Sequence, residues 1–294
     1  MQINIQLDNE KKKNEFVDKK NIIFFSDYFL KKKNEKKIYF SSLIGLRDKN
    51  EDTHNIILTK DVNMYAIYDG HGGTFTSKFL SKYLPMYLLN NLEIPIKKKK
   101  IINVFNHIQK ILVKKYNKHA TETGSTCLIC LEYFFNNKKL ISIINLGDSR
   151  GVICRNNCAI PLSKDHKPSW PEEKYRIEKL NGKIYLDKYD DWRIHDLSVS
   201  RAFGDIYAHP HVCQTPDIFN YLISPKDKFV VLACDGLWDV LSNQDVINYI
   251  LYNCYNDSLS ERTNKDIDIS KKLAEYAIKK GSTDNISIII IFFD

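Results

Sequence analysis

Acidic residues stand beside apolar runs at five places along this sequence. The clearest cases are Asp69 and Asp235, each of which directly follows an apolar run and directly precedes a glycine. Taken singly, an Asp-Gly pair at the end of a strand is most simply a turn. The other members of the set are Glu51 with Asp52, Asp148 and Asp284. Together they would crowd carboxylates at the ends of packed strands, where burial is costly unless cations neutralise them.

The available ligand atoms indicate which cation is favoured. The sequence has no His-x-x-x-His pair and no cluster of cysteines, so a zinc or iron site is disfavoured. Carboxylates, a glycine carbonyl and water form an oxygen-only environment that suits Mg²⁺ or Mn²⁺. Several carboxylates allow two ions, and two ions ~3.5–4 Å apart can clamp the attacking and leaving oxygens of a phosphoryl displacement. The chemistry alone therefore favours metal-dependent phosphoester hydrolysis.

The elements that must position these residues are runs of strands with helices between them. β-Branched and aromatic runs bounded by turn residues predict strands at 38–44, 55–59, 64–68, 125–135, 140–146, 151–155, 228–234 and 285–293. Apolar periodicity and capping residues predict helices at 74–90, 101–119, 171–181 and 268–280, and one from the Ser242–Asp245 cap to about 253. This order predicts a layered α+β domain rather than a doubly wound parallel sheet.

Composition separates a short N-terminal segment from the rest of the chain. Residues 1–37 form a Lys/Asn-rich extension with one apolar island, Ile22–Leu30, which we expect to be a first strand or a short helix. Residues 38–294 contain no Gly/Ser/Pro linker, so they are predicted to form a single catalytic domain. No apolar run approaches the ~20 residues of a membrane span, and no signal peptide is recognisable. We therefore expect no membrane partner and a cytoplasmic or nuclear location.

The seven cysteines are odd in number and scattered, so a disulfide framework is not expected. One Cys-x-x-Cys pattern, Cys127 and Cys130, lies in an apolar, strand-like run. Residues three apart in a strand point to opposite faces, which suits neither a zinc site nor a redox pair. We therefore predict two buried thiols.

The net charge of +8 comes mainly from lysines that gather in residues 11–37 and 97–100. Such charge favours binding to nucleic acid. However, no interleaving of aromatic and basic residues and no helix-turn-helix pattern accompanies it. We therefore predict that nucleic acid is not a partner.

Eight segments, which include the acidic residues described above, follow one another in a recognisable order. They are Gly45–Asp52, Tyr68–Gly73, Thr123–Thr126, Asn145–Gly151, Asp165–Pro168, Leu197–Asp205, Ala233–Val240 and Gly281–Asn285. In this order the chain resembles the metal-dependent protein phosphatases of the PPM type, also called the protein phosphatase 2C family, from about residue 38 to residue 294. The resemblance implies a central β-sandwich of two mainly antiparallel sheets with helices on both faces.

The resemblance also implies which residues bind the ions. Asp69 would bridge two Mg²⁺ or Mn²⁺ ions. The carbonyl of Gly70 would bind one of them, and Asp235 with Asp284 would bind the other.

Four more acidic residues are implied around this pair of ions. Glu51 and Asp52 would hold metal-bound waters. Asp148 and Asp239 are candidates for a weaker third ion, which they would share with Asp235.

The implied reaction is hydrolysis by direct attack of a hydroxide that bridges the two ions, without a phosphoenzyme. Arg47 would bind the substrate phosphate, because its fork of donors fits phosphate oxygens in a way that Lys cannot. His71 would protonate the leaving serine or threonine oxygen, a role worth ~10²–10⁴-fold in rate. The implied partners are phosphoprotein substrates, and we expect a monomer.

One segment departs from the family pattern. Residues 183–196 should form the flap beside the active site, yet they are acidic and aromatic. His195 and Asp196 stand where the family often has a polar residue and a glycine. The substrate preference is therefore left open.

Three alternatives remain beside the phosphatase hypothesis. A pseudophosphatase would use the same fold only to bind phosphoproteins, but Asp69, Asp235 and Asp284 are all present. A phosphodiesterase or nucleotidase would use the same metals in a closed, aromatic-lined pocket, whereas a shallow cleft favours a phosphoprotein substrate. A basic nucleic-acid binder would show a steep salt dependence of binding.

Overall fold

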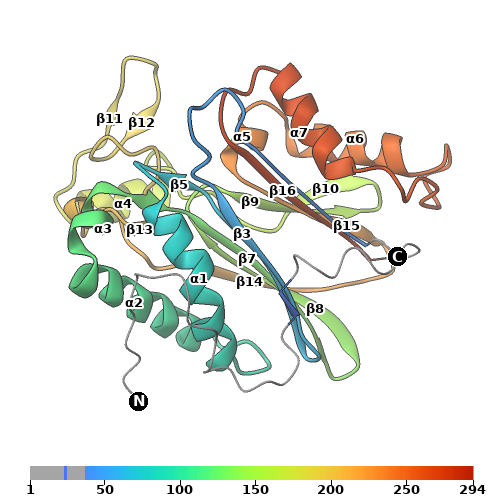
Figure 1. The fold of residues 1–294 in the computed structure, drawn as a ribbon, viewed down its shortest axis with the longest axis horizontal. Helices are drawn as coiled ribbons and strands as arrows, with labels where there is room; N and C mark the ends of the chain where they lie inside the picture. Colours follow the sequence, from blue (N-terminus) through green and yellow to red (C-terminus); the bar gives the residue numbers. More distant parts are fainter. Residues whose placement is uncertain (1–22, 25–36, 294) are drawn as a thin grey trace, which may run out of the picture.

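Two antiparallel sheets stack face to face at the centre of the computed structural model, which describes residues 23–24 and 37–293 (Figure 1). Within this described part, one sheet has the strand order β1-β3-β4-β7-β8-β14 and the other has the order β10-β9-β15-β16-β2. The strands of the first sheet are β1 (Ile23–Phe24), β3 (Thr53–Leu58), β4 (Val62–Tyr68), β7 (Cys127–Phe135), β8 (Lys138–Leu146) and β14 (Asp217–Leu222). Those of the second are β2 (Ile38–Leu43), β9 (Arg150–Arg155), β10 (Cys158–Pro161), β15 (Asp227–Ala233) and β16 (Ile286–Phe292). The predicted α+β sandwich is confirmed.

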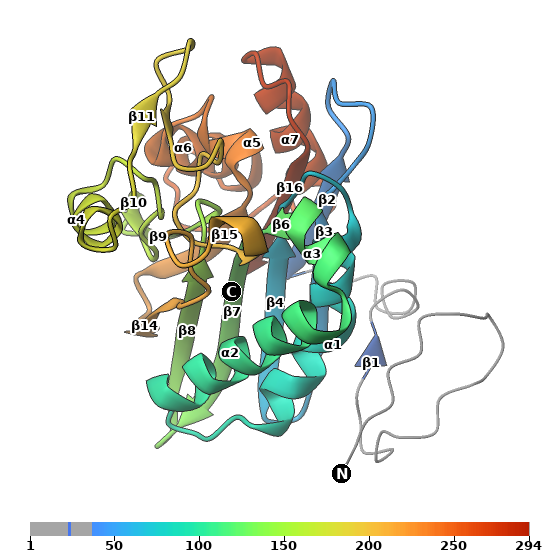
Figure 2. The same ribbon diagram turned by 90° about the vertical axis from the view of Figure 1, so that its left-hand side faces the viewer.

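Helices cover the outer face of each sheet. Figure 2 shows α1 and α2 lying side by side across β4, β7 and β8. The helices of this layer are α1 (Phe75–Asn90), α2 (Lys98–Lys115) and α3 (Asn117–Glu122). The opposite layer consists of α5 (Asp235–Trp238), α6 (Asn243–Cys254) and α7 (Ile269–Lys279). Their apolar faces and the sheets form two outer cores, and a third core lies between the sheets.

Strand β7 shows how one apolar run supplies two cores. Cys127 and Ile129 face the helix layer, whereas Leu128 and Cys130 face the second sheet. This alternation follows from the two-residue period of a strand. Both thiols are buried and free, as predicted.

The predicted elements agree with the structure except at a few places. The helix predicted at 101–119 is interrupted at Tyr116, whose φ of −131° and ψ of 32° are not helical, so α2 and α3 are separate. Ser242 and Asp245 form the predicted capping box of α6. The edge strands β10 and β14 were not predicted. Both are only partly buried, so they lack the apolar signal that marks a central strand.

The N-terminal extension is mostly outside the described residues. Within the apolar island, Ile23 and Phe24 form β1, which pairs with Leu58 and Ile57 of β3. This favours the strand over the helix for these two residues, and the rest of the island lies outside the described part. In that part, none of the helices has the length and apolar character needed to cross a lipid bilayer.

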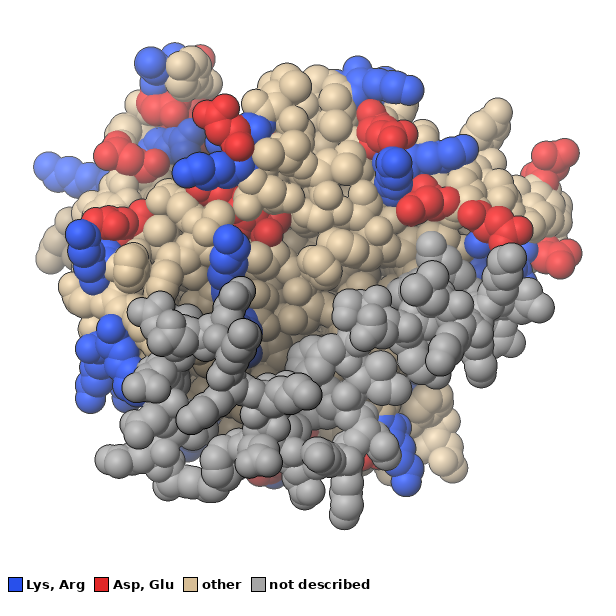
Figure 3. Space-filling model, in the orientation of Figure 1, with Lys and Arg blue, Asp and Glu red and all other residues tan. Residues whose placement is uncertain are grey.

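Small elements gather above one end of the sandwich. Helix α4 (Pro171–Lys179) leads into a hairpin of β11 (Tyr185–Leu186) and β12 (Trp192–Arg193), which projects from the body in Figure 2. A second small sheet joins β13 (Phe203–Gly204), β6 (Gly124–Ser125) and β5 (Gly70–His71). The 3₁₀ helix η1 (Ile206–Ala208) follows it. On the face in Figure 3, basic and acidic side chains are mixed over this region, without a large stretch of one sign among the coloured atoms.

Candidate active site and metal centre

The loops at one end of the sandwich enclose a cavity of about 510 Å³. Strands β4 and β15 run toward it; β4 ends directly before Asp69, and β15 ends at Ala233, two residues before Asp235. Strands β9 and β16 run away from it and begin shortly after Asp148 and Asp284. The predicted site residues that line the cavity are Arg47, Glu51, Asp69, Gly70, His71, Asp148, Asp235 and Asp284. The fold therefore brings these eight residues, from segments far apart in the sequence, to one cavity.

Three carboxylates form the centre of this cavity. One oxygen from each of Asp69, Asp148 and Asp235 lies within 4.8 Å of the others. Burial raises the pKa of Asp69 well above its ordinary value, and the neighbouring charges of Asp235 and Asp52 add to the effect. Burial likewise raises the pKa of Asp235, with Asp148 as the next cause. A cation among these groups would remove the repulsion that disfavours their charged forms.

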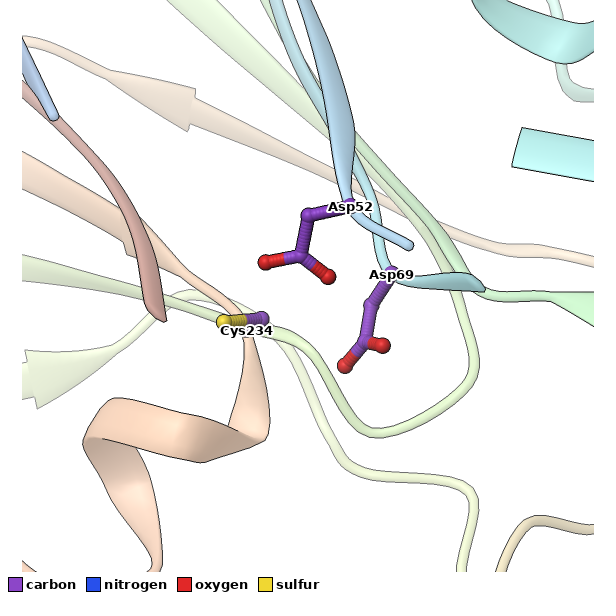
Figure 4. A group of neighbouring side chains, drawn as sticks. All are labelled: Asp52, Asp69 and Cys234. Atoms are coloured by element: carbon purple, nitrogen blue, oxygen red, sulfur yellow. The ribbon is translucent and has the colours of Figure 1, made fainter. Parts of the chain in front are cut away.

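Asp52 lies beneath the cavity rather than on its wall. Its side chain is 8% exposed, and neither carboxylate oxygen has a hydrogen-bond partner among the described residues. Figure 4 shows Asp52 facing Asp69, with Cys234 beside the pair. Ligand atoms of these three residues also lie within 4.8 Å of one another. Sequence reasoning missed Cys234, because nothing in the spacing shows that the residue before Asp235 points toward Asp52.

The oxygen donors fit the predicted ions. Asp69, Asp148 and Asp235 offer carboxylate oxygens close enough together to hold one ion, and Gly70 lines the same cavity. A Cβ atom on Gly70 would lie 2.5 Å from the carbonyl oxygen of Glu51, so the close approach of these two segments requires glycine. This donor set suits Mg²⁺ or Mn²⁺.

Arg47 stands at the mouth of the cavity. Its Nη2 atom lies 2.7 Å from Oδ2 of Asp284, and its side chain is 58% exposed. The loop that carries Arg47 is held by Asn285, whose side chain donates to the carbonyls of Ile44 and Lys49. The loop that carries Arg47 is thus anchored, while the side chain of Arg47 remains accessible to solvent.

His71 pairs with a residue that was not predicted as part of the site. Its Nε2 lies 2.8 Å from Oδ2 of Asp205, which is 2% exposed. Burial lowers the pKa of His71, but the charge of Asp205 and the hydrogen bond to it outweigh burial, so the pKa is raised. A Cβ atom on Gly124 would lie 2.2 Å from the Nε2 of His71, so glycine leaves the room for this pair. Asp205 lies in a segment quoted for the resemblance, but no spacing rule links it to His71.

Lys167 and His166 support Asp148 from the other side. The ammonium of Lys167 forms an ion pair with Asp148. The Nδ1 of His166 accepts a hydrogen bond from the backbone N–H of Gly147 at 3.0 Å, and its Nε2 lies 3.3 Å from Oδ2 of Asp217. These two residues hold the turn that carries Asp148, a role that the Asp165–Pro168 motif did not reveal.

Asp239 takes a more peripheral position. It lies one helical turn after Asp235, and its backbone N–H donates to the carbonyl of Asp235 at 2.9 Å. The pKa of Asp235 is raised first by burial, then by the charge of Asp148, and then by the charge of Asp239. Asp239 is exposed and is not part of the cavity wall, so its role in a third ion site stays a prediction.

The segment 183–196, predicted to be the flap, lines one side of the cavity through Arg193 and Asp196, and residues 197–199 continue this wall. Arg193 forms ion pairs at 2.9 Å with Asp187 and with Asp191 of the same hairpin. His195 Nε2 lies 2.8 Å from Nδ1 of His211. Two of the four acidic residues of the flap thus hold its own arginine.

Comparison with known proteins agrees with this geometry. The sequence profile of the family described as protein phosphatase 2C matches residues 37–286. The chain belongs to the protein phosphatase 2C family. A PP2C-like domain-containing protein of Acanthamoeba polyphaga mimivirus is 47% identical over 169 residues, which cover 52% of this chain and 94% of that protein.

Longer relatives in the protein phosphatase 2C family match most of the chain. The human integrin-linked kinase-associated serine/threonine phosphatase 2C is 30% identical over 318 residues, covering 96% of this chain and 78% of the relative. The probable protein phosphatase 2C 71 of Arabidopsis thaliana is 33% identical and covers 86% of this chain, which spans 55% of that relative. The structure of a phosphatase from Toxoplasma gondii is similar to this chain, with a TM-score of 0.75 and 23% sequence identity. The match covers 87% of this chain and 92% of the Toxoplasma chain, so the two share a fold.

Proposed function

We propose that this member of the protein phosphatase 2C family is a Mg²⁺- or Mn²⁺-dependent phosphatase that hydrolyses phosphoserine and phosphothreonine in proteins. The observation that carries the proposal is the convergence of Asp69, Asp148 and Asp235 within 4.8 Å at the floor of a cavity. Charged groups at that separation are tolerated in a folded protein when cations neutralise them. Such a cluster is what metal-assisted phosphoryl transfer requires.

The proposed ligands are those implied by the sequence. Asp69, Asp235 and Asp284, with the carbonyl of Gly70, would hold two ions, and Glu51 with Asp52 would support them through water. When bound, the ions supply an activated water for direct attack on phosphorus and positive charge for the phosphoryl oxygens. Asp148 with Asp239 would support a third, weaker ion beside Asp235.

The side chains of the protein perform the remaining tasks. Arg47 would bind two phosphate oxygens with its planar fork, since its exposed guanidinium is held at the cavity mouth by a single carboxylate. His71 would give a proton to the leaving serine or threonine oxygen. The carboxylate of Asp205 on Nε2 raises the pKa of His71 and thereby favours the protonated form that a general acid needs.

The lining of the cavity favours a protein substrate over a small aromatic one. Among the described residues that line it there is no Phe, Tyr or Trp on which a nucleobase could stack. Charged and small polar residues dominate, and Asp196 of the flap and Ser198 shortly after it form one wall. This supports a cleft that receives a phosphorylated side chain rather than a nucleotide.

The test is hydrolysis of a phosphothreonine peptide and of p-nitrophenyl phosphate with Mn²⁺, with Mg²⁺ and with EDTA. We expect metal-dependent turnover that EDTA abolishes. Asp235→Asn should lower turnover by more than the roughly 10–100-fold that outer-shell changes cause at metal sites. Asp257→Asn removes an exposed carboxylate elsewhere and should have no effect. A folded protein without turnover at any metal concentration would contradict the enzyme and favour the pseudophosphatase.

A further inference from the structure

The thiol of Cys234 lies beneath the floor of the cavity, in a setting that differs from those of Cys127 and Cys130. Those two thiols are buried among apolar side chains. Cys234 is also completely buried, but its Sγ belongs to a group with carboxylate oxygens of Asp52 and Asp69, all within 4.8 Å of one another. Figure 4 shows the three side chains converging on one space.

The carboxylate of Asp52 is the second sign of a ligand site. It is 8% exposed, and neither oxygen has a hydrogen-bond partner among the described residues. Two neighbouring donors, the hydroxyl of Ser287 and the thiol of Cys234, are directed at other acceptors. The hydroxyl of Ser287 donates to Ser42 at 3.0 Å, and the thiol of Cys234 donates to the carbonyl of Asn285 at 3.3 Å. A buried carboxylate without donors is costly unless a cation accompanies it.

We propose that Cys234, Asp52 and Asp69 form a binding site for a thiophilic divalent cation such as Zn²⁺ or Cd²⁺. A thiolate favours such ions over Mg²⁺, while carboxylate oxygens complete the coordination of Zn²⁺ in many sites. Asp69 belongs to both clusters, so it would be shared between the oxygen-only centre and this deeper site.

Binding exchanges one proton for the cation. The Sγ–H proton leaves to solvent, and the hydrogen bond to the carbonyl of Asn285 is lost. The backbone N–H of Ser287 already donates to Sγ at 3.1 Å and would continue to stabilise the thiolate. Such an outer-shell donor orients and supports a metal ligand.

Occupation of this site has a consequence for catalysis. Drawing Asp69 toward Cys234 takes it from the oxygen-only cluster, so a thiophilic cation should inhibit turnover. This consequence rests on the proposed phosphatase function, whereas binding of the cation does not.

The test is titration of the metal-free 294-residue chain with Cd²⁺, followed by the ultraviolet charge-transfer absorption of a cadmium–thiolate bond. We expect a band that saturates at one Cd²⁺ per chain. Cys158→Ser removes an exposed thiol and should retain the band, whereas Cys234→Ser should lose it. A band that persists in Cys234→Ser, or that disappears in Cys158→Ser, would overturn the proposal.

Asp52→Asn is the second variant, because it keeps every thiol. It tests the proposed cation site even if Cys234→Ser does not fold. Its affinity for Cd²⁺ should fall at least about tenfold, and an unchanged affinity would overturn the site. Inhibition of Mn²⁺-dependent turnover by Zn²⁺ is measured separately. If the Cd²⁺ band forms but the wild-type protein shows no turnover with Mn²⁺, the phosphatase function fails and the thiophilic site stands.

Discussion

The Nε2 of His71 lies 2.8 Å from Oδ2 of Asp205, a residue 134 positions later in the chain. Strands β5, β6 and β13 bring the two together, and Gly124 of β6 provides the space between them. An acceptor on Nε2 holds the ring in one orientation and leaves Nδ1 as the nitrogen that can exchange a proton with the substrate. Asp205 is therefore expected to act through His71.

Asp205→Asn tests this relationship through the leaving group. We expect turnover of a phosphothreonine peptide to fall about 10–100-fold, because a poor leaving group depends on proton donation. Turnover of p-nitrophenyl phosphate should change much less, since its leaving group needs no proton. His71→Gln should show the same selectivity. Equal losses on both substrates would contradict a role in proton donation.

Arg47→Lys tests the recognition of phosphate. Lys keeps the charge but cannot offer two parallel donors. We expect the KM for the phosphopeptide to rise about tenfold, the loss of roughly one charge-assisted hydrogen bond. Lys49→Met is the matched control, because it removes a positive charge from the wall of the same cavity. An unchanged KM in Arg47→Lys, together with a higher KM in Lys49→Met, would show that only the overall charge matters.

His166→Gln tests the support of the Asp148 turn. His166 is 2% exposed and does not line the cavity, so it would act only through the backbone of Gly147. We expect the Mn²⁺ concentration for half-maximal turnover to rise about tenfold, with little change in the KM for peptide. His119→Gln, at an exposed ring outside the cavity lining, is the control. Lower thermal stability with an unchanged Mn²⁺ dependence would point to a structural role only.

Glu173 should make the stability of the folded protein depend on pH in the acidic range. Burial raises the pKa of Glu173, but hydrogen bonds from Arg201 and Arg176 outweigh it and lower the pKa from 4.5 to about 2. Because the folded pKa lies below the unfolded one, this stabilisation is complete above about pH 4.5 and disappears as the pH falls toward 2. It amounts to the order of 3 kcal/mol at neutral pH.

Urea unfolding of Glu173→Gln between pH 7 and pH 2.5 measures this effect. The variant should be less stable than the wild type at pH 7, and the difference should shrink as the pH falls. Glu178→Gln on the exposed side of the same helix should change stability by less than about 0.5 kcal/mol. A difference that is independent of pH would contradict the assignment.

Local sequence patterns predicted most of the secondary structure. The strands β4, β7, β15 and β16 are mainly apolar because most of their residues are buried on both faces, and such runs can be recognised without a structure. The edge strand β14 was missed, since one face of it meets solvent and its residues carry a mixed pattern. The interruption at Tyr116 was also missed, because apolar periodicity continues across it.

The sequence by itself determined the order of the elements and the placement of Asp69, Asp148, Asp235 and Asp284 beside strands. These are local properties, set by apolar periodicity and turn residues. Only the tertiary structure decided which side chains meet. The contact of His71 with Asp205 and the position of Cys234 beside Asp52 depend on how distant strands pair and which way a side chain points at a strand end. Sequence spacing does not predict either contact, because both depend on packing over the whole chain.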